Sequence, residues 1–214
     1  MKKTLLLAGA ATLFGVASAQ AAVLYGPTPY LSQADSPFVG HTGWMLEDFE
    51  DGLLMDGVSS IGGMAIGPSW ITDSVDGDDG AIDGFGTAGS SYFTPDGNGG
   101  AWFMFHGDIL GFVPKSVGIV WTDGAGTITF EAFDTNGASL GVLTGNHADG
   151  SHLGETGDDR FYGVSNWDGI GSLHIRNSSG GIEVDHVQFS ASVPAPSAAA
   201  LLGLGAMFAG RRRR

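Results

Sequence analysis

Closely spaced aspartates are the clearest sign of chemistry in this sequence. The densest stretch, residues 73 to 84, contains Asp73, Asp76 and Asp78 among several glycines. Calcium takes about six to eight oxygen ligands, and aspartates in a loop turned by glycines can supply several of them. The EF-hand pattern does not fit, because neither register has its glycine at position six and glutamate at position twelve. We therefore predict calcium at Asp73, Asp76 and Asp78, with a solvated acidic loop as the alternative.

Basic and acidic residues lie in different regions of the chain. The 214 residues carry 9 Lys and Arg against 23 Asp and Glu, a formal net charge of −14. Lys2, Lys3 and the four arginines at 211–214 hold most of the basic charge, whereas all the acids lie between Asp35 and Asp185. The interior therefore carries a charge of about −20, which repels phosphate backbones and excludes nucleic acid as a partner.

Motifs of catalytic centres do not fit their required context. Residues 137–141 match the G-x-S-x-G pattern of hydrolases around Ser139. That pattern needs a strand-to-helix turn, whereas this segment lies in a strand–Asn–Gly–strand context. The chain has no cysteine, and its six histidines form no H-E-x-x-H motif. We therefore predict a non-catalytic protein, with a secreted hydrolase as an alternative.

One tryptophan is a candidate for ligand binding. Trp102 and Trp121 lie within apolar segments and are interpreted as core residues, whereas Trp167 lies in the loop Ser-Asn-Trp-Asp-Gly. An exposed aromatic ring can stack on a sugar ring. A carbohydrate-binding module that holds a polysaccharide at Trp167 is therefore an alternative function, although a loop tryptophan can also close one end of a sandwich.

The body of the chain is predicted to be all-β. Residues 127–133 alternate, with Ile128, Phe130 and Ala132 on one face, and Asn136-Gly137 then predicts a hairpin with residues 138–143. Further apolar segments predict strands at 102–105, 117–121, 161–164, 173–176 and 182–189. Many short strands separated by turn residues favour a single β-sandwich of jelly-roll type over residues 23–192.

The two ends of the chain are typical of export signals. Lys2 and Lys3 precede an apolar run over 5–16 and the sequence Ala17-Ser18-Ala19, which predicts a signal peptide over 1–22 with cleavage after Ala19. At the other end, residues 193–214 contain two prolines, a short apolar segment predicted to be helical, and four arginines. Such a segment can enter a membrane, and its basic cluster stops translocation of the chain on the cytoplasmic side.

The order of features at the C-terminus resembles the PEP-CTERM sorting signal of exported Gram-negative bacterial proteins. The motif consists of Val193, Pro194, Ala195 and Pro196, with Ala195 in place of the family's glutamate. The resemblance implies a sorting protease as a partner, transient contact with the inner membrane, and a final location at the cell surface or outside the cell. An ordinary C-terminal membrane anchor is the alternative.

The body is similar to a domain common in PEP-CTERM-type proteins, and through it to the jelly rolls of carbohydrate-binding modules. The likeness lies in residues 46–52, 118–124, 158–164 and 182–186. In such domains an acidic first strand and an aspartate in the last strand flank a structural calcium. The resemblance therefore implies a second metal site, at Asp48, Glu50 and Asp185, if the strand through Phe49 alternates so that Asp48 and Glu50 share a face. Acids that line a solvent face are the alternative.

Together these features predict an exported, non-catalytic protein of the cell surface or extracellular matrix, stabilised by calcium and associated with exopolysaccharide or biofilm.

Processing of both ends can be tested on the exported protein by mass spectrometry. We expect the mature chain to begin after Ala19, or after Ala21 or Ala22, and to lack the tail beyond Pro196. Detection of an intact arginine cluster, 211–214, on protein recovered from the cell surface would refute removal of the tail.

Overall fold

The computed structural model describes residues 21–77, 89–151 and 156–193. Residues 1–20 of the predicted signal peptide (1–22), residues 194–214 of the predicted C-terminal segment (193–214) and Asp78 lie outside these ranges. The strands are β1 (Val23–Pro29), β2 (Met45–Glu47), β3 (Val58–Ile61), β4 (Met64–Ile66), β5 (Ser91–Thr94), β6 (Ala101–Phe105), β7 (Ser116–Phe133), β8 (Ser139–Gly145), β9 (Arg160–Ser165) and β10 (Ser172–Ser190). Three short helices complete the described elements: η1 (Gln33–Asp35), η2 (Val75–Gly77) and α1 (Gly107–Leu110). None of the described helices is long and apolar enough to cross a membrane.

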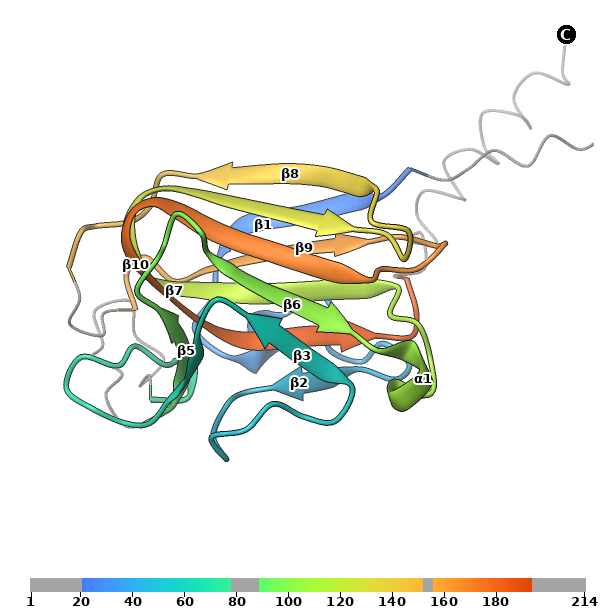
Figure 1. The fold of residues 1–214 in the computed structure, drawn as a ribbon, viewed down its shortest axis with the longest axis horizontal. Coiled ribbons are helices and arrows are strands. Elements are labelled where there is room, and N and C mark those ends of the chain that lie inside the picture. Colours follow the sequence, from blue (N-terminus) through green and yellow to red (C-terminus); the bar gives the residue numbers. More distant parts are fainter. Residues whose placement is uncertain (1–20, 78–88, 152–155, 194–214) are drawn as a thin grey trace, which may run out of the picture.

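Two long strands, β7 and β10, organise the fold. They pair antiparallel along most of their length, and every other strand except β1, β3 and β4 pairs directly with one of them. Figure 1 shows β8, the second half of β7, the first half of β10, β6 and β3 side by side in front of β1, β9 and the other halves of β7 and β10. The all-β fold and the two-layer jelly-roll sandwich are thus as predicted.

Both layers share β7 and β10 because these strands bend. Gly124, Gly126 and Gly180 have positive φ angles of 148°, 86° and 73°, and the β7–β10 register shifts between Asn177 and Ile182. The buried Asn177 fixes the bend, since its Nδ2 donates to the carbonyl oxygens of Ala125, Ser179 and Gly181 at 3.1, 2.6 and 2.7 Å. Glycine admits these backbone angles without steric cost.

The bend corrects the sequence prediction of separate strands. Segments 117–121 and 127–133 are two halves of β7, and segments 173–176 and 182–189 are two halves of β10. From the sequence alone, the glycines between these segments predict turns that separate strands. In the structure they turn the strand while its ladder continues on the other side of the bend.

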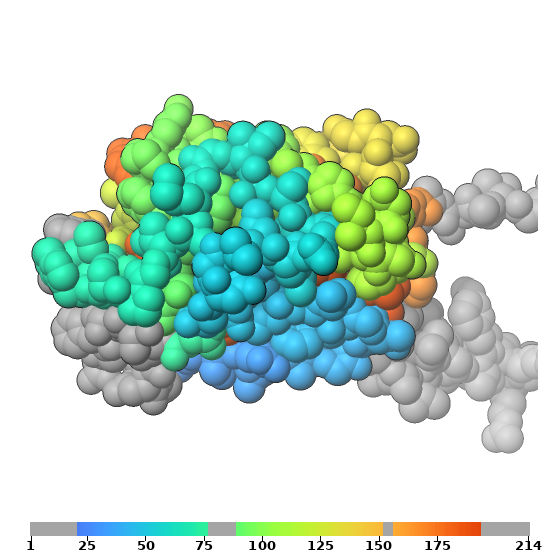
Figure 2. Space-filling model, turned by 60° about the horizontal axis from the view of Figure 1, so that its bottom comes forward, coloured from blue at the N-terminus to red at the C-terminus, as the bar shows by residue number. Residues whose placement is uncertain are grey.

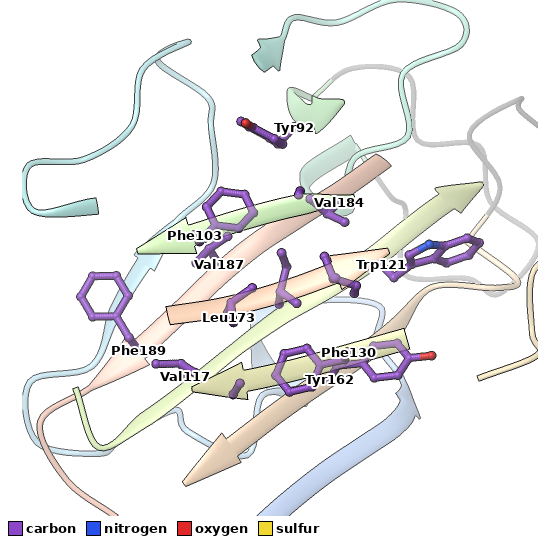
Figure 3. Packing of buried hydrophobic residues seen from close by; sticks show 14 of the residues in the cluster. Tyr92, Phe103, Val117, Trp121, Phe130, Tyr162, Leu173, Val184, Val187 and Phe189 are labelled. Carbon is purple, nitrogen blue, oxygen red and sulfur yellow. The ribbon is translucent and has the colours of Figure 1, made fainter. Parts of the chain in front are cut away.

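The main core lies between the two layers. Both halves of β7 contribute to it, with Val117 and Trp121 from the first and Phe130 from the second (Figure 3). The alternation over 127–133 is as predicted, because Ile128, Phe130 and Ala132 are all buried. Trp102 differs from its predicted core position: it points outward from β6 and is stacked on His174, with ring centroids 4.2 Å apart.

A second, smaller core covers the outer face of the layer that holds β9. Tyr30, Phe38 and Val75 from the chain between the strands pack there on Val120 and Phe161. The blue-to-teal residues that precede β5 spread over one side of the molecule in Figure 2. This cover matters for the site, because it buries polar side chains that a bare sheet would expose to water.

Candidate metal centre

Buried acidic residues gather on the outer face of the second half of β10. Glu183 and Asp185 are two residues apart on the strand and point to the same face. Their exposed fractions are 5% and 0%. The segment 72–77, which includes η2, lies over them and shields them from solvent. These carboxylates are therefore in a site of low dielectric, where an ionised group needs donors or a cation.

Asp185 obtains its donors from the covering segment. Its Oδ2 accepts hydrogen bonds from the backbone N–H of Val75 at 3.0 Å and from Ser74 Oγ at 3.2 Å. Its Oδ1 accepts from the backbone N–H of His186 at 2.6 Å. The backbone of His186 has a positive φ of 45°, and the imidazole Nε2 lies 3.2 Å from Asp76 Oδ2. Asp76, Asp185 and His186 form a first group whose ligand atoms lie within 4.8 Å of one another.

A second group consists of carboxylates alone. Asp73, Asp158 and Asp159 each offer an oxygen within 4.8 Å of the others, and all three side chains are buried. Asp73 comes from the covering segment, whereas Asp158 and Asp159 directly precede β9. Arg160 follows them, but its Nη1 donates to the backbone oxygens of Gly157 and Asp159 at 3.1 and 2.7 Å. We call this group the three-aspartate cluster.

Burial is the largest cause of the raised pKa values of these acids. It raises the pKa of Asp185 to about 7 and that of Asp158 to about 6, and the negative charge of Asp149 adds to the shift at Asp158. Burial also raises the pKa of Glu183 and Asp123 to about 7. A nearby cation would favour the ionised form of each group and oppose these shifts.

His186 is the exception among these groups. Burial alone would lower its pKa, but the hydrogen bond to Asp76 and the charges of Asp185, Asp76 and Asp48 raise it above its ordinary value. On its other side, Nδ1 lies 3.1 Å from the hydroxyl of Tyr30, which accepts from Gln188 Nε2 at 2.8 Å. The imidazole thus links the acidic residues to the second core.

The structure groups the predicted metal ligands differently from the two sites predicted from the sequence. Asp73 and Asp76 come from one predicted site, but Asp76 joins Asp185 while Asp73 joins Asp158 and Asp159. The third member of that predicted loop, Asp78, lies outside the described residues.

Asp48 and Glu50 are not in either group, and the prediction that a strand runs through Phe49 is wrong. β2 ends at Glu47, and Phe49 has a positive φ of 58°. The side chain of Phe49 enters the core, and Glu47 is the buried acid, with Oε1 accepting from the N–H of Phe49 at 2.8 Å. Glu50 is exposed and accepts a hydrogen bond from the N–H of Ser90.

Sequence reasoning missed Asp158, Asp159 and His186 as candidate ligands. A pair of adjacent aspartates before a buried strand, Phe161–Val164, was visible in the sequence. Nothing in the local pattern shows that this pair meets Asp73, which lies 85 positions earlier in the chain. The contact depends on the covering segment, whose path cannot be inferred from strand periodicity.

The other predicted residues are placed as follows. Ser139 of the G-x-S-x-G match begins β8 and is exposed, so the strand-to-helix turn of a nucleophile elbow is not formed there. Trp167 is 41% exposed, and Lys115 Nζ lies 5.9 Å from the centre of its ring. The expected exposure of Trp167 is therefore present, with a cation beside the ring.

No family model and no curated protein matches the chain. Among solved structures, it is similar to the catalytic domain of a GH87 α-1,3-glucanase, with 12% identity and a TM-score of 0.42, over 73% of this chain and 29% of that one. It is also similar to the K1 adhesin domain of Lys-gingipain from Porphyromonas gingivalis W83, with 14% identity and a TM-score of 0.41, over 70% and 99% of the chains. A third is the family 22 carbohydrate binding module of Clostridium thermocellum Xyn10B, with 15% identity and a TM-score of 0.32, over 71% and 95%.

The raised pKa values predict how stability depends on pH. A carboxyl whose pKa is higher in the folded than in the unfolded chain stabilises the fold while it is protonated. That contribution is lost between its unfolded value, about 4, and its folded value, about 7. In differential scanning fluorimetry, we expect metal-stripped full-length protein to melt at a lower temperature at about pH 8 than at about pH 5.

The Asp185→Asn variant provides the control, because a carboxamide does not titrate. The difference in Tm between the two pH values should be smaller in this variant than in the wild type. An equal or higher wild-type Tm at the higher pH would contradict the assignment of these buried acids.

Proposed function

We propose that this chain is an exported, non-catalytic protein of the cell surface or exopolysaccharide matrix, and that calcium stabilises its β-sandwich. The export signals predicted at residues 1–22 and 193–214 support the location. The position of Ser139 in β8 supports a non-catalytic role, because the one catalytic pattern in the sequence lacks its required geometry.

The observation that carries the calcium proposal is the three-aspartate cluster. Asp73, Asp158 and Asp159 have exposed fractions of 1%, 5% and 0%, and they bring oxygens within 4.8 Å of one another. Like charges at this separation oppose one another's ionisation, and a divalent cation reverses the effect. All of the offered atoms are carboxylate oxygens, which is the ligand type that calcium prefers.

The group around Asp185 fits calcium less well. Both oxygens of Asp185 accept hydrogen bonds from described protein groups, and the third member is an imidazole nitrogen. Imidazole suits zinc and other transition metals, whereas calcium prefers oxygen. We therefore assign calcium to the three-aspartate cluster and a structural role to Asp185.

Chelation distinguishes these roles. Removal of calcium from the full-length protein should lower its Tm by about 5 to 10 °C, because calcium at about a hundred times its Kd adds about 2.7 kcal/mol of stability. Added calcium should restore the Tm. The Asp158→Asn variant should lose this response, whereas Asp185→Asn should melt lower than the wild type and still respond.

An exposed acid gives the matched control. Asp56→Asn should behave as the wild type in both conditions. A wild-type Tm that is the same with and without chelator would count decisively against a structural calcium ion, and a response that survives in Asp158→Asn would exclude the three-aspartate cluster.

A polysaccharide partner is the second candidate function, favoured by the exposure of Trp167. The indole is 41% exposed and lies next to Lys115, so a ring face and a donor are available together. Sugar rings stack on aromatic faces, and an ammonium group can donate to their hydroxyls.

A glycan array tests this candidate directly. The full-length protein should bind one or more polysaccharides, and Trp167→Ala should weaken that binding at least tenfold. Trp70→Ala is a matched control, because Trp70 is 70% exposed and lies in a different loop. No binding across chemically diverse glycans would reject the candidate, and equal loss in both variants would remove the role of Trp167.

A further inference from the structure

A small cavity opens at the bend of β7 and β10. Its volume is about 220 Å³, and it lies between the two bent strands, β5 and the loop that contains Ser151. Binding pockets for drug-sized ligands usually have about 300 to 1,000 Å³, so this cavity suits a smaller group. Glycines from both strands form part of its wall and leave the backbone accessible.

Two carboxylates face each other at this cavity. Asp123 of β7 and Glu183 of β10 are directly opposed in the antiparallel register, and both line the cavity. Like charges in directly opposed positions destabilise a sheet. A ligand that neutralises both acids would remove this cost.

Glu183 has one oxygen available to such a ligand. The side chain is only 5% exposed, and its Oε1 accepts hydrogen bonds from the backbone N–H of Asp73 at 2.9 Å and from Ser91 Oγ. In the described part of the chain, Oε2 has no hydrogen-bond partner, yet it is not among the fully enclosed atoms. Glu183 lines the cavity, which makes this oxygen a candidate acceptor for a ligand bound there.

The charge of the lining selects the ligand. Among the described residues, no lysine, arginine or histidine lines the cavity, and the charges of Asp158 and Asp149 act on Asp123 from nearby. An anionic ligand would be repelled by these groups, and a neutral ligand would leave the two carboxylates uncompensated. The ligand should therefore carry a positive charge.

The apolar part of the lining favours an organic cation over a metal ion. Phe93 and Ile182 contribute to the wall, and two carboxylates are too few for the coordination shell of calcium. An ammonium group has three donors for the carboxylates, and its carbon skeleton can pack on the phenyl ring, which also attracts positive charge.

We propose that this cavity binds a primary ammonium group carried on a short carbon skeleton, held between Asp123 and Glu183 and against Phe93. An amino sugar and an aliphatic polyamine both supply this chemistry. The inference goes beyond the proposed function, because it requires neither calcium nor export, and the cavity is separate from Trp167.

Isothermal titration calorimetry on the calcium-saturated full-length protein tests the proposal. The probes are glucosamine, glucose, N-acetylglucosamine and putrescine. Glucosamine should bind at least tenfold more tightly than glucose and N-acetylglucosamine, which lack the ammonium group. Binding of putrescine as well as glucosamine would show that the ammonium group suffices, whereas binding of glucosamine alone would identify the amino sugar as the source of the amine.

Variants locate the binding. Asp123→Asn and Glu183→Gln should each weaken amine binding at least tenfold, while Asp108→Asn, an exposed acid in α1, should leave it unchanged. Because Glu183 also accepts from Asp73 and Ser91, the melting curve of each variant is recorded first, and Asp123→Asn decides if Glu183→Gln does not fold.

Three results would overturn the inference: equal affinity for glucose and glucosamine, full amine binding in Asp123→Asn, or no binding of either amine. None of these depends on the chelator response. A protein that responds to calcium but binds no amine would retain the proposed function and lose this inference.

Discussion

The hydrogen bonds that Asp185 accepts from the segment 72–77 hold this segment over the buried acids of β10. A fully buried carboxylate is tolerated only with donors around it, and here Ser74 and Val75 supply them from a part of the chain 110 positions away. The same segment carries Asp73 and Asp76 to their neighbours and inserts Val75 into the second core. The hydrogen bonds of this segment to Asp185 and Glu183 thus help to set where several acids lie.

The bend in β7 and β10 provides the second constraint. A sandwich made from separate short strands would need connections at its ends, whereas here the chain passes from one layer to the other within each long strand. Asn177 and the positive-φ glycines fix the angle of that passage. The bend also places Asp123 opposite Glu183, so a feature of the fold produces the cavity and its charge.

The sequence predicts the parts of this structure that depend on local pattern. The all-β class, the hairpin at Asn136-Gly137 and the inward face of Ile128, Phe130 and Ala132 follow from periodicity and turn residues. The outward position of Trp102 does not, because an unbroken apolar run carries no information about which face is buried.

The candidate site was only partly predictable for a related reason. Asp73, Asp76 and Asp185 could be chosen by their residue type and spacing, but their partners depend on tertiary contacts of the covering segment. The assumption that a strand runs through Phe49 failed, because β2 ends at Glu47 and Phe49 has a positive φ. Asp48 and Glu50 accordingly do not join Asp185 in either group of candidate ligands, and Glu47 is the buried acid of this segment.

The long pairing of β10 has a mechanical consequence. Near its end, β10 pairs with β2 through Val187–Phe189 and with β7 as far as Ser190, and Ser190 also accepts a hydrogen bond from the N–H of Lys115 at 2.8 Å. A force applied to the chain after Val193 and directed along this strand would act on both flanking ladders at once. Hydrogen bonds loaded together in shear share the tension, whereas those of a peeled strand fail one after another, so β10 is built to resist extraction from the sandwich.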